Sequence, residues 1–247
     1  MDTKDNRIIK ASFKDCPLSD RATFATSSCI MPISVGQAVH EGQKFLAVIK
    51  LINRTFKSCT LMIDDSVQRH TMKIDKDIDD TAAYSLAMDA GDEWLARNKT
   101  SYQQLSIPHN IVRWDDWFDK PRFKNTYAQV TSLYNQNENY SDAIKANIID
   151  FLSRYKVHHP DKKWDYERAF YLCLDYLLEE CAVMLLWAEH QYPFEVYPTG
   201  RNQAMGATHK FLIEPSEPNL LRSVALRFKK YGMSEDAAIS RSRELLT

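Results

Sequence analysis

Residues 29–64 read CIMPISVGQAVHEGQKFLAVIKLINRTFKSCTLMID, with one amphipathic segment between two apolar segments of strand length. The first apolar segment ends a strand that we expect over residues 24–34, and the second is residues 59–64. From Glu41 to Lys57, apolar residues recur at spacings of three and four, which is the pattern of an amphipathic helix. The order strand, helix, strand predicts a βαβ unit with two parallel strands.

Pro32 and Ser34 lie at the end of the first strand. Proline has no N–H to donate to a neighbouring strand, so Pro32 predicts that this strand ends nearby or lies at an edge of the sheet. Ser34 follows two residues later, and Gly36 follows Ser34. A serine at the tip of a strand is a turn residue, a phosphate contact or a nucleophile, and the local segment leaves all three open.

The rest of the chain continues to alternate between strands and helices. Further strands are expected over residues 7–13, 111–114 and 194–197, and helices over 79–98, 122–156 (with a break near 135–139) and 166–190. A short helix begins near Asn202, and residues 216–247 are expected to form a helical extension in which Ser234, with Glu235 and Asp236 after it, is an N-cap. The alternation predicts one α/β domain with a mainly parallel sheet.

The composition excludes several classes of protein. The chain has 247 residues and a net charge of −1, so it has no overall positive charge to attract nucleic acid. Its five cysteines form no CxxC pair, which is typical of a reduced protein. The polar start MDTKDNR is no signal peptide, and the longest apolar run, residues 181–188, is too short to span a bilayer. We therefore expect a cytoplasmic protein.

The sequence has none of the common motifs that bind nucleotide phosphates or zinc. No GxGxxG or GxxxxGK[ST] follows a strand, and ISVGQ around Ser34 differs from the GxSxG nucleophile elbow. No HEXXH motif and no Cys/His cluster indicates a metal. The histidines are scattered, and each is expected to be a surface or hydrogen-bonded residue: His40, His70, His109, His158, His159, His190 and His209.

Polar residues follow several strands and also interrupt the most apolar helix. Ligands of open α/β sheets bind beyond the carboxyl ends of the strands, where Ser34, the segment DDSVQRH (64–70) and Tyr197 are expected. Tyr176 and Glu180 are four residues apart, so they share a helix face. A glutamate in so apolar a helix needs solvent or a cationic partner. The alternative interpretation is that Glu180 and its neighbour Glu179 form an exposed face, with Tyr176 packed beneath it.

Four segments together resemble the tRNA-dependent cyclodipeptide synthases. They are CIMPISVG, HEGQKFLAVIKLINRTFKSCTLMIDDSVQRHT, DYLLEECAVML and FEVYPTGRNQAMGATHK, in this order. They lie within about residues 28–72 and 165–210, nearly half of the chain. The resemblance implies a Rossmann-like three-layer sandwich, similar to the catalytic domain of class I tyrosyl- and tryptophanyl-tRNA synthetases but without their ATP-binding signatures.

The resemblance also implies a reaction. The family takes two aminoacyl-tRNAs and makes a cyclic dipeptide, a 2,5-diketopiperazine. The ester to tRNA is already activated, so no ATP, no other cofactor and no metal is expected. In a ping-pong sequence, Ser34 would carry an aminoacyl ester and then a dipeptide. Tyr176 and Glu180 match the pair that holds the α-amino group, and Tyr197 matches a tyrosine that positions the acyl group or relays protons.

The resemblance further implies partners and substrate contacts. The expected partners are two aminoacyl-tRNAs, with no membrane, and the protein is expected to be a monomer. Residues near the motifs are expected to bind substrate: Gly36, Gln37, Asp65, Gln68, Arg69, His70 and Pro198. Gly36 would keep the turn after Ser34 small for a bulky ester, and Arg69 and His70 would suit an acidic side chain or the tRNA acceptor end. Gln37 and Pro198 indicate the family branch defined by Tyr-Pro.

This chain departs from the family pattern in two places. The family often has glycine two residues before the nucleophile, where this chain has Pro32, so the wall of the first amino-acid pocket is expected to differ. Residues 81–99 lack the basic helix with which better-known members hold tRNA. Phosphate contacts must then come from other residues, although each is equally explained as an ordinary solvated charge: Lys156, Lys162, Lys163, Arg168, Arg222, Arg227, Lys229 and Lys230.

Two other functions fit parts of the sequence. A non-catalytic module that binds aminoacyl-tRNA on the same fold would be expected to have lost the nucleophile, whereas Ser34 is present. A nucleotide-dependent enzyme on a Rossmann-like sheet would need a phosphate-binding loop, which the sequence lacks. The sequence therefore favours the aminoacyltransferase.

Overall fold

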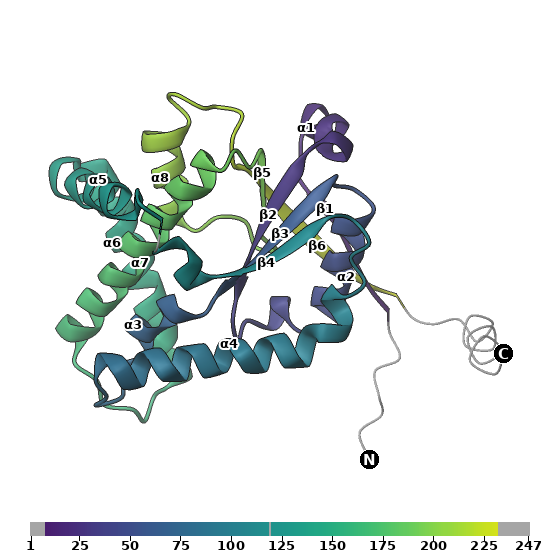
Figure 1. Ribbon diagram of the computed structural model, residues 1–247. Coiled ribbons are helices and arrows are strands. Elements are labelled where there is room, and N and C mark those ends of the chain that lie inside the picture. Colours follow the sequence, from purple (N-terminus) through teal and green to yellow (C-terminus); the bar gives the residue numbers. More distant parts are fainter. Residues whose placement is uncertain (1–7, 119, 232–247) are drawn as a thin grey trace, which may run out of the picture.

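The computed structural model describes residues 8–118 and 120–231, in which a six-stranded sheet lies between helices (Figure 1). The strands are β1 (Ile8–Lys14), β2 (Ser28–Ser34), β3 (Ser58–Asp64), β4 (His109–Arg113), β5 (Phe194–Val196) and β6 (Arg222–Tyr231), in the spatial order β1-β6-β5-β2-β3-β4. All neighbouring pairs are parallel except β1 with β6. The mainly parallel sheet predicted from the sequence is confirmed.

The order of the strands reverses beside β2. From β2 the chain moves outward to β3 and β4, then returns to the other side of β2 with β5 and β6. The carboxyl ends of β2 and β5 therefore border the crevice in which open α/β sheets bind their ligands. Ser34 ends β2 and Tyr197 directly follows β5, so the sequence places both residues at this crevice.

The helices form layers on the two faces of the sheet. They are α1 (Leu18–Thr23), α2 (Gly42–Asn53), α3 (Arg69–Met72), α4 (Asp80–Tyr102), α5 (Phe123–Gln136), α6 (Glu138–His158), α7 (Tyr166–Glu189) and α8 (Gln203–Thr208). Figure 1 shows α5 to α8 gathered on one side, away from α2. The helix expected over 122–156 does break, between α5 and α6, where Asn137 caps α6 by accepting a hydrogen bond from the Tyr140 N–H at 3.0 Å.

Alternate side chains of the central strands enter two separate cores, because successive residues of a strand point to opposite faces. Ile30 packs with the residues of α7 in one core, whereas Met31 belongs to the second core with α2. In the second core the rings of Phe45 and Trp94 lie 5.0 Å apart and join α2 to α4. Burial on both faces explains why β2 and β3 read as nearly continuous apolar runs.

The helical extension expected from residue 216 is wrong for the described part of the tail. Residues 222–231 form β6, the strand between β5 and β1. Val224 and Leu226 are buried and Arg227 is exposed, which is the two-residue period of a strand. The expected N-cap at 234–236 lies outside the described residues.

Of the two expectations for Pro32, the nearby end of the strand is confirmed and the edge position is wrong. β2 lies inside the sheet, but its pairing with β5 stops at Ile30, so only β3 pairs with β2 at Pro32. The strand then ends two residues later, at Ser34. Residues 24–26 form a 3₁₀ turn instead of the first part of this strand. In the described residues, no helix is long and apolar enough to cross a membrane.

Candidate active site

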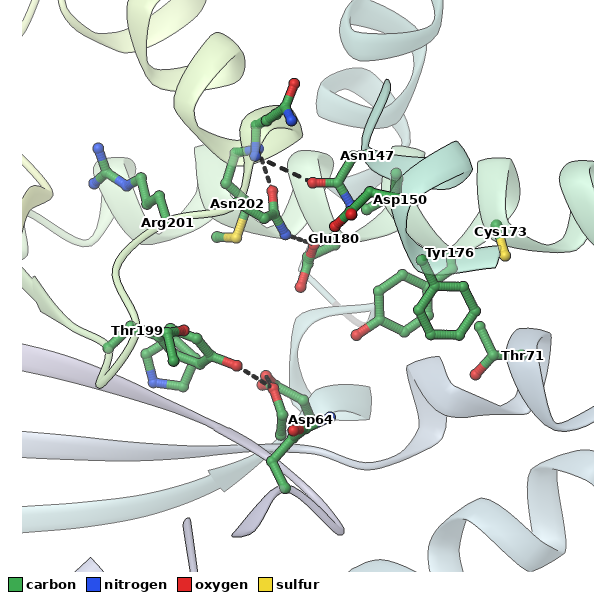
Figure 2. Close-up of a pocket in the computed structure, with 18 of the residues that line it drawn as sticks. Asp64, Thr71, Asn147, Asp150, Cys173, Tyr176, Glu180, Thr199, Arg201 and Asn202 are labelled. Carbon is green, nitrogen blue, oxygen red and sulfur yellow. Dashed lines mark hydrogen bonds between the residues drawn. The ribbon is translucent and has the colours of Figure 1, made fainter. Parts of the chain in front are cut away.

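A cavity of about 520 Å³ opens at the carboxyl ends of β2, β3 and β5. Its lining includes all four residues that the resemblance assigns to catalysis: Ser34, Tyr176, Glu180 and Tyr197. Helices α6 and α7 form the opposite wall, and Figure 2 shows Tyr176 and Glu180 across the cavity from Asp64. The crevice at the strand ends is therefore a cavity lined by several polar groups.

Ser34 presents its hydroxyl to two side chains. Its Oγ lies 2.9 Å from the Tyr197 hydroxyl and 3.5 Å from the Asp64 carboxylate oxygen Oδ2. Asp64 is the residue of β3 in register with Ser34, so the pairing of the two strands sets this contact. Gly36 has a φ of +84° in the turn that follows, where the Gln37 N–H donates to the Ser34 carbonyl at 3.1 Å. The positive φ is the reason for glycine here, since an added Cβ would meet no atom within 4 Å.

His40 holds the main chain of Ser34, and it does not contact the hydroxyl. The Ser34 N–H donates to Nδ1 of His40 at 3.0 Å, and the ring is fully buried. Burial lowers the pKa of His40 to about 4, so the ring is neutral at pH 7 and Nδ1 can accept. The Trp94 indole N–H donates to the His40 carbonyl at 3.0 Å and fixes the loop from behind. His40 thus acts as a support for the strand tip, and the arrangement differs from a Ser-His-Asp triad.

Tyr176 and Glu180 project from one face of α7, as their spacing predicts. Glu180 is 8% exposed, and Asn202 donates to its Oε2 at 3.2 Å. Burial is the main reason that the pKa of Glu180 rises to about 7, since this hydrogen bond compensates only partly. Burial and the nearby carboxylate of Glu180 also raise the pKa of the Tyr176 phenol. A buried glutamate without a cationic partner is a suitable site for an ammonium group.

The alternative of an exposed acidic face is wrong, because Glu179 is buried too and has a complete set of donors. Arg69 binds it with two hydrogen bonds, at 2.9 and 2.5 Å, and His70 lies 3.0 Å from Oε2. The indole N–H of Trp114 adds a fourth contact, at 2.8 Å. Burial alone would raise the pKa of Glu179, but the donors from His70 and Arg69 outweigh it and lower the pKa. The pKa values of the two adjacent glutamates are thus shifted in opposite directions, down for Glu179 and up for Glu180.

Three other carboxylates line the same cavity: Asp150, which is exposed, and the buried Asp64 and Glu195. Glu195 is buried and paired with Arg201, with 2.6 Å between Oε2 and Nε. Asp64 is buried but has no cationic partner, and its Oδ1 makes no hydrogen bond. In the described parts of the chain, no group of three or more His, Cys, Asp or Glu side chains could hold a metal ion.

Comparisons with known proteins identify the family. A scan of protein-family models gives no match, and a search of curated proteins gives no significant match. Among solved structures, a cyclodipeptide synthase from Fluoribacter dumoffii is 57% identical, with a TM-score of 0.89, over 92% of this chain and 100% of that one. The chain belongs to the cyclodipeptide synthases. These are tRNA-dependent enzymes, and the expected family and enzyme class are confirmed.

More distant structures share the fold of this synthase. A cyclodipeptide synthase from Candidatus Glomeribacter gigasporarum, solved bound to Phe-tRNAPhe, is 19% identical with a TM-score of 0.67 over 84% of this chain and 89% of that one. A Mycobacterium tuberculosis protein, whose structure relates cyclodipeptide synthetases to type I tRNA synthetases, is 9% identical with a TM-score of 0.62 over 94% and 99%. The Rossmann-like, synthetase-related fold is therefore confirmed.

The residues expected to bind substrate fall into two groups in the synthase. Gln37 and Gln68 line the cavity, and Gln68 also donates to the Val35 and Asp64 carbonyls, at 3.1 and 3.0 Å. The others have internal roles: Gly36 shapes the turn, Arg69 and His70 bind Glu179, and Pro198 is buried. Asp65 is also internal, with its Oδ2 paired to Arg113 at 2.6 Å. None of these five is among the residues that line the described cavity.

The basic residues proposed to contact tRNA lie in two separate places. Lys162 pairs with Asp75, and Arg168 donates to the Lys76 carbonyl at 3.5 Å, so the 159–165 loop lies against the loop that follows α3. The second group belongs to β6 and consists of Arg222, Arg227, Lys229 and Lys230. In this group, Arg222 pairs with Asp20 and Arg227 pairs with Asp15.

Sequence reasoning missed His40 and Arg201 as supports of this site, and it placed Asp64 at the strand ends within segment 64–70 without giving it a role of its own. A signal for Asp64 was present, because it ends the strand that pairs with the strand of Ser34. His40 and Arg201 gave no such signal, since their roles depend on contacts with a main-chain amide and a buried glutamate.

Proposed function

We propose that this synthase joins two aminoacyl groups into a cyclodipeptide by a ping-pong reaction on Ser34. In the first step, Ser34 Oγ attacks the ester carbonyl of an aminoacyl-tRNA, an aminoacyl-serine forms, and the ribose oxygen leaves. In the second step, the amine of the serine-bound aminoacyl group attacks the ester of a second aminoacyl-tRNA, the second tRNA leaves, and the resulting dipeptide remains on Ser34. In the last step, the new terminal amine attacks the seryl ester, which closes the ring and frees Ser34.

The observation that carries this proposal is the convergence of four side chains from three separate elements on one cavity. Ser34 Oγ is 2.9 Å from the Tyr197 hydroxyl, and Tyr176 and Glu180 face them from α7. We assign the α-ammonium of the first aminoacyl group to Glu180, because a charged hydrogen bond would satisfy this carboxylate and orient the ester. Tyr197 would donate to Ser34 Oγ and so help the serine to leave when the ring closes. Gln37, Gln68 and Tyr176 would line the substrate.

The same site argues against the non-catalytic alternative. A module that only binds aminoacyl-tRNA has no need for a hydroxyl that a turn, a buried histidine and two side chains hold in place. The Tyr-Pro pair is part of this construction: Tyr197 reaches Ser34, and the carbonyl of the buried Pro198 accepts from the Leu226 N–H at 3.1 Å. We therefore also assign the synthase to the family branch with Tyr-Pro.

We further propose that the 159–165 loop contacts tRNA. This loop lies against residues 75 and 76, and Thr71 of the preceding helix lines the cavity. Arg154 of α6 lines it as well. Lys162 and Lys163 of the loop, with Arg168 in the first turn of α7, therefore lie beside the segment that follows α3, whereas the basic residues of β6 lie two strands away from β2.

Expression in bacteria tests the proposed activity. The medium of cells that make the wild-type protein is expected to contain a 2,5-diketopiperazine, detected by mass spectrometry, and Ser34→Ala is expected to abolish it. Ser28→Ala, the serine at the opposite end of the same strand, is the matched control and should leave the product unchanged. Absence of product from a folded wild-type protein with charged tRNA in supply would favour the non-catalytic module.

A further inference from the structure

Asp64 is a buried carboxylate in the cavity to which the reaction above gives no role. It is 2% exposed, and its Oδ1 has no hydrogen-bond partner. Its other oxygen, Oδ2, faces Ser34 Oγ at 3.5 Å. Its main chain is held in place, because Gln68 Nε2 donates to its carbonyl at 3.0 Å. A carboxylate so buried and so incompletely bonded is costly to keep, which points to a role toward a ligand or a proton.

The neighbouring carboxylates bind a guanidinium or an amide group, whereas the one side chain that hydrogen-bonds to the Asp64 carboxylate in the described residues is that of Ser34. Glu195 is paired with Arg201, Asp65 with Arg113, and Glu180 accepts from Asn202. These three acids, together with the phenols of Tyr176 and Tyr197, are the titratable groups around Asp64. Burial first, and then the charges of Glu180, Asp65 and Glu195, raise the pKa of Asp64. Its carboxylate is therefore a stronger base than an aspartate in water.

The choice of a base for Ser34 is narrow. Tyr197 and Asp64 are the side chains in the described residues that hydrogen-bond to Ser34 Oγ. The phenol of Tyr197 is a weak proton acceptor, because burial raises its pKa and keeps its own proton in place. The nearest histidine, His40, uses Nδ1 for the Ser34 main chain. Among the described side chains of the protein, Asp64 is the remaining group that can accept the proton of the hydroxyl.

We propose that Asp64 is a catalytic residue that takes the proton of Ser34 when the serine is acylated; this inference rests on the proposed function. As Ser34 Oγ bonds to the ester carbonyl carbon, its proton moves to the Asp64 carboxylate. The bond from that carbon to the ribose oxygen breaks, and the ribose oxygen receives the proton from Asp64. In the cyclisation step Asp64 accepts a proton from the attacking amine and passes it to the leaving Ser34 Oγ, while the Tyr197 hydroxyl donates a hydrogen bond to the same oxygen and keeps its own proton. The carboxylate is regenerated each time.

Binding of the substrate would prepare Asp64 for this step. The α-ammonium group, held at Glu180, brings a positive charge into a cavity with three buried carboxylates, Asp64, Glu180 and Glu195. A nearby positive charge favours the ionised form of a carboxyl group. Asp64 would therefore be ionised when an aminoacyl ester is in place.

The test follows acylation of Ser34 in single-turnover reactions with radiolabelled aminoacyl-tRNA and intact protein. Asp64→Asn keeps the size of the side chain but cannot take a proton, and we expect acylation at saturating substrate to slow by about 10²- to 10⁴-fold. Asp64→Ala leaves space beside the hydroxyl, and added formate is expected to speed its acylation at least about tenfold. Formate should not speed the wild type or Ser34→Ala. Asp89→Asn, an exposed aspartate of α4, is the matched control for loss of one charge.

The outcomes separate this inference from the proposed function. If the wild type takes up no label, the proposed function fails. If the wild type is labelled and Asp64→Asn is labelled at the same saturating rate, Asp64 is not the base. An Asp64→Asn variant in which only KM rises would also overturn the assignment. So would a correctly folded Asp64→Ala variant, with normal thermal unfolding, whose slow acylation is not accelerated by formate.

Discussion

Glu179 and Glu180 show how a single residue step changes the role of a side chain. Both are buried on α7, but one faces Arg69, His70 and Trp114 and the other faces the cavity. Ionised Glu179 is stabilised by donors, whereas ionised Glu180 has only Asn202. The fold therefore uses the first glutamate to anchor α7 and leaves the second available to a substrate.

This difference predicts opposite effects on stability. The pKa of Glu180 is about 7 in the fold, against its ordinary value of 4.5. The folded protein binds the Glu180 proton more tightly than the unfolded chain does. Protonation of Glu180 therefore stabilises the fold fully below pH 4.5, and this stabilisation is lost as the pH rises through 7. Glu180→Gln should therefore unfold at the same free energy as the wild type near pH 4.5 and be more stable by about 3 kcal/mol above pH 7.

Glu179→Gln is the matched substitution, one residue away. It leaves the Arg69 guanidinium without its carboxylate, and we expect a loss of about 3–5 kcal/mol at pH 7. Urea unfolding at pH 5 and pH 8 measures both variants. If Glu180→Gln and the wild type have the same free energy of unfolding at both pH values, burial of the ionised Glu180 does not destabilise the fold.

At the scale of elements, the packing of α4 against the ends of β3 and β4 holds the site in place. Gly91 of α4 backs directly onto the Asp65–Arg113 ion pair, next to Asp64. An added Cβ at Gly91 would lie 2.6 Å from Asp65 Oδ2 and 2.7 Å from Arg113 Nη2. The absence of a side chain in the middle of this helix is therefore required by close approach.

We predict that Gly91→Ala destabilises the protein by about 2 kcal/mol, because the cost of overpacking exceeds the gain in helix propensity. Gly206→Ala in α8 is the control, since no atom lies within 4 Å of its added Cβ. That variant should be more stable by about 0.4–1 kcal/mol. Chemical denaturation compares the two, and equal effects would contradict the role assigned to Gly91.

How far the elements could be predicted depends on how local their signals are. Segments with a clear period, such as α2 and α7, and the parallel pairing of β2 with β3 follow from the sequence. The strand β6 was not predicted, although Val224 and Leu226 are separated by a single residue, as on one face of a strand. It forms by pairing with β1, at the other end of the chain, and with β5, and such pairings leave no local signal. The site divides in the same way. The motif residues were found by resemblance, whereas Asp64, His40 and Arg201 act through contacts that only the fold creates.

At the scale of the whole molecule, the net charge of the synthase is −1, although its substrate, tRNA, is a large polyanion. Its binding surface must therefore be local, and the proposed surface is the 159–165 loop, which lies against the segment that follows α3. Lys163 of this loop is exposed, and Lys229 on β6 is exposed as well but lies at the far side of the sheet. The two lysines make a matched pair with the same charge.

We predict that Lys163→Glu weakens binding of aminoacyl-tRNA and that Lys229→Glu does not. Loss of one phosphate contact should lower the slope of log affinity against log salt by about one, equally for different tRNAs. Filter binding across a salt series measures this slope. The reverse result, with the larger effect from Lys229→Glu, would move the tRNA to the β6 side.

The measurement that tests the central assignment most directly is the intact mass of the protein after rapid mixing with aminoacyl-tRNA and an acid quench. The wild type should gain the mass of one aminoacyl group, and peptide mapping should place it on Ser34, while Ser34→Ala should gain none. A wild-type protein that makes cyclodipeptide without any such mass gain, or a Ser34→Ala variant that is still acylated, would contradict the account.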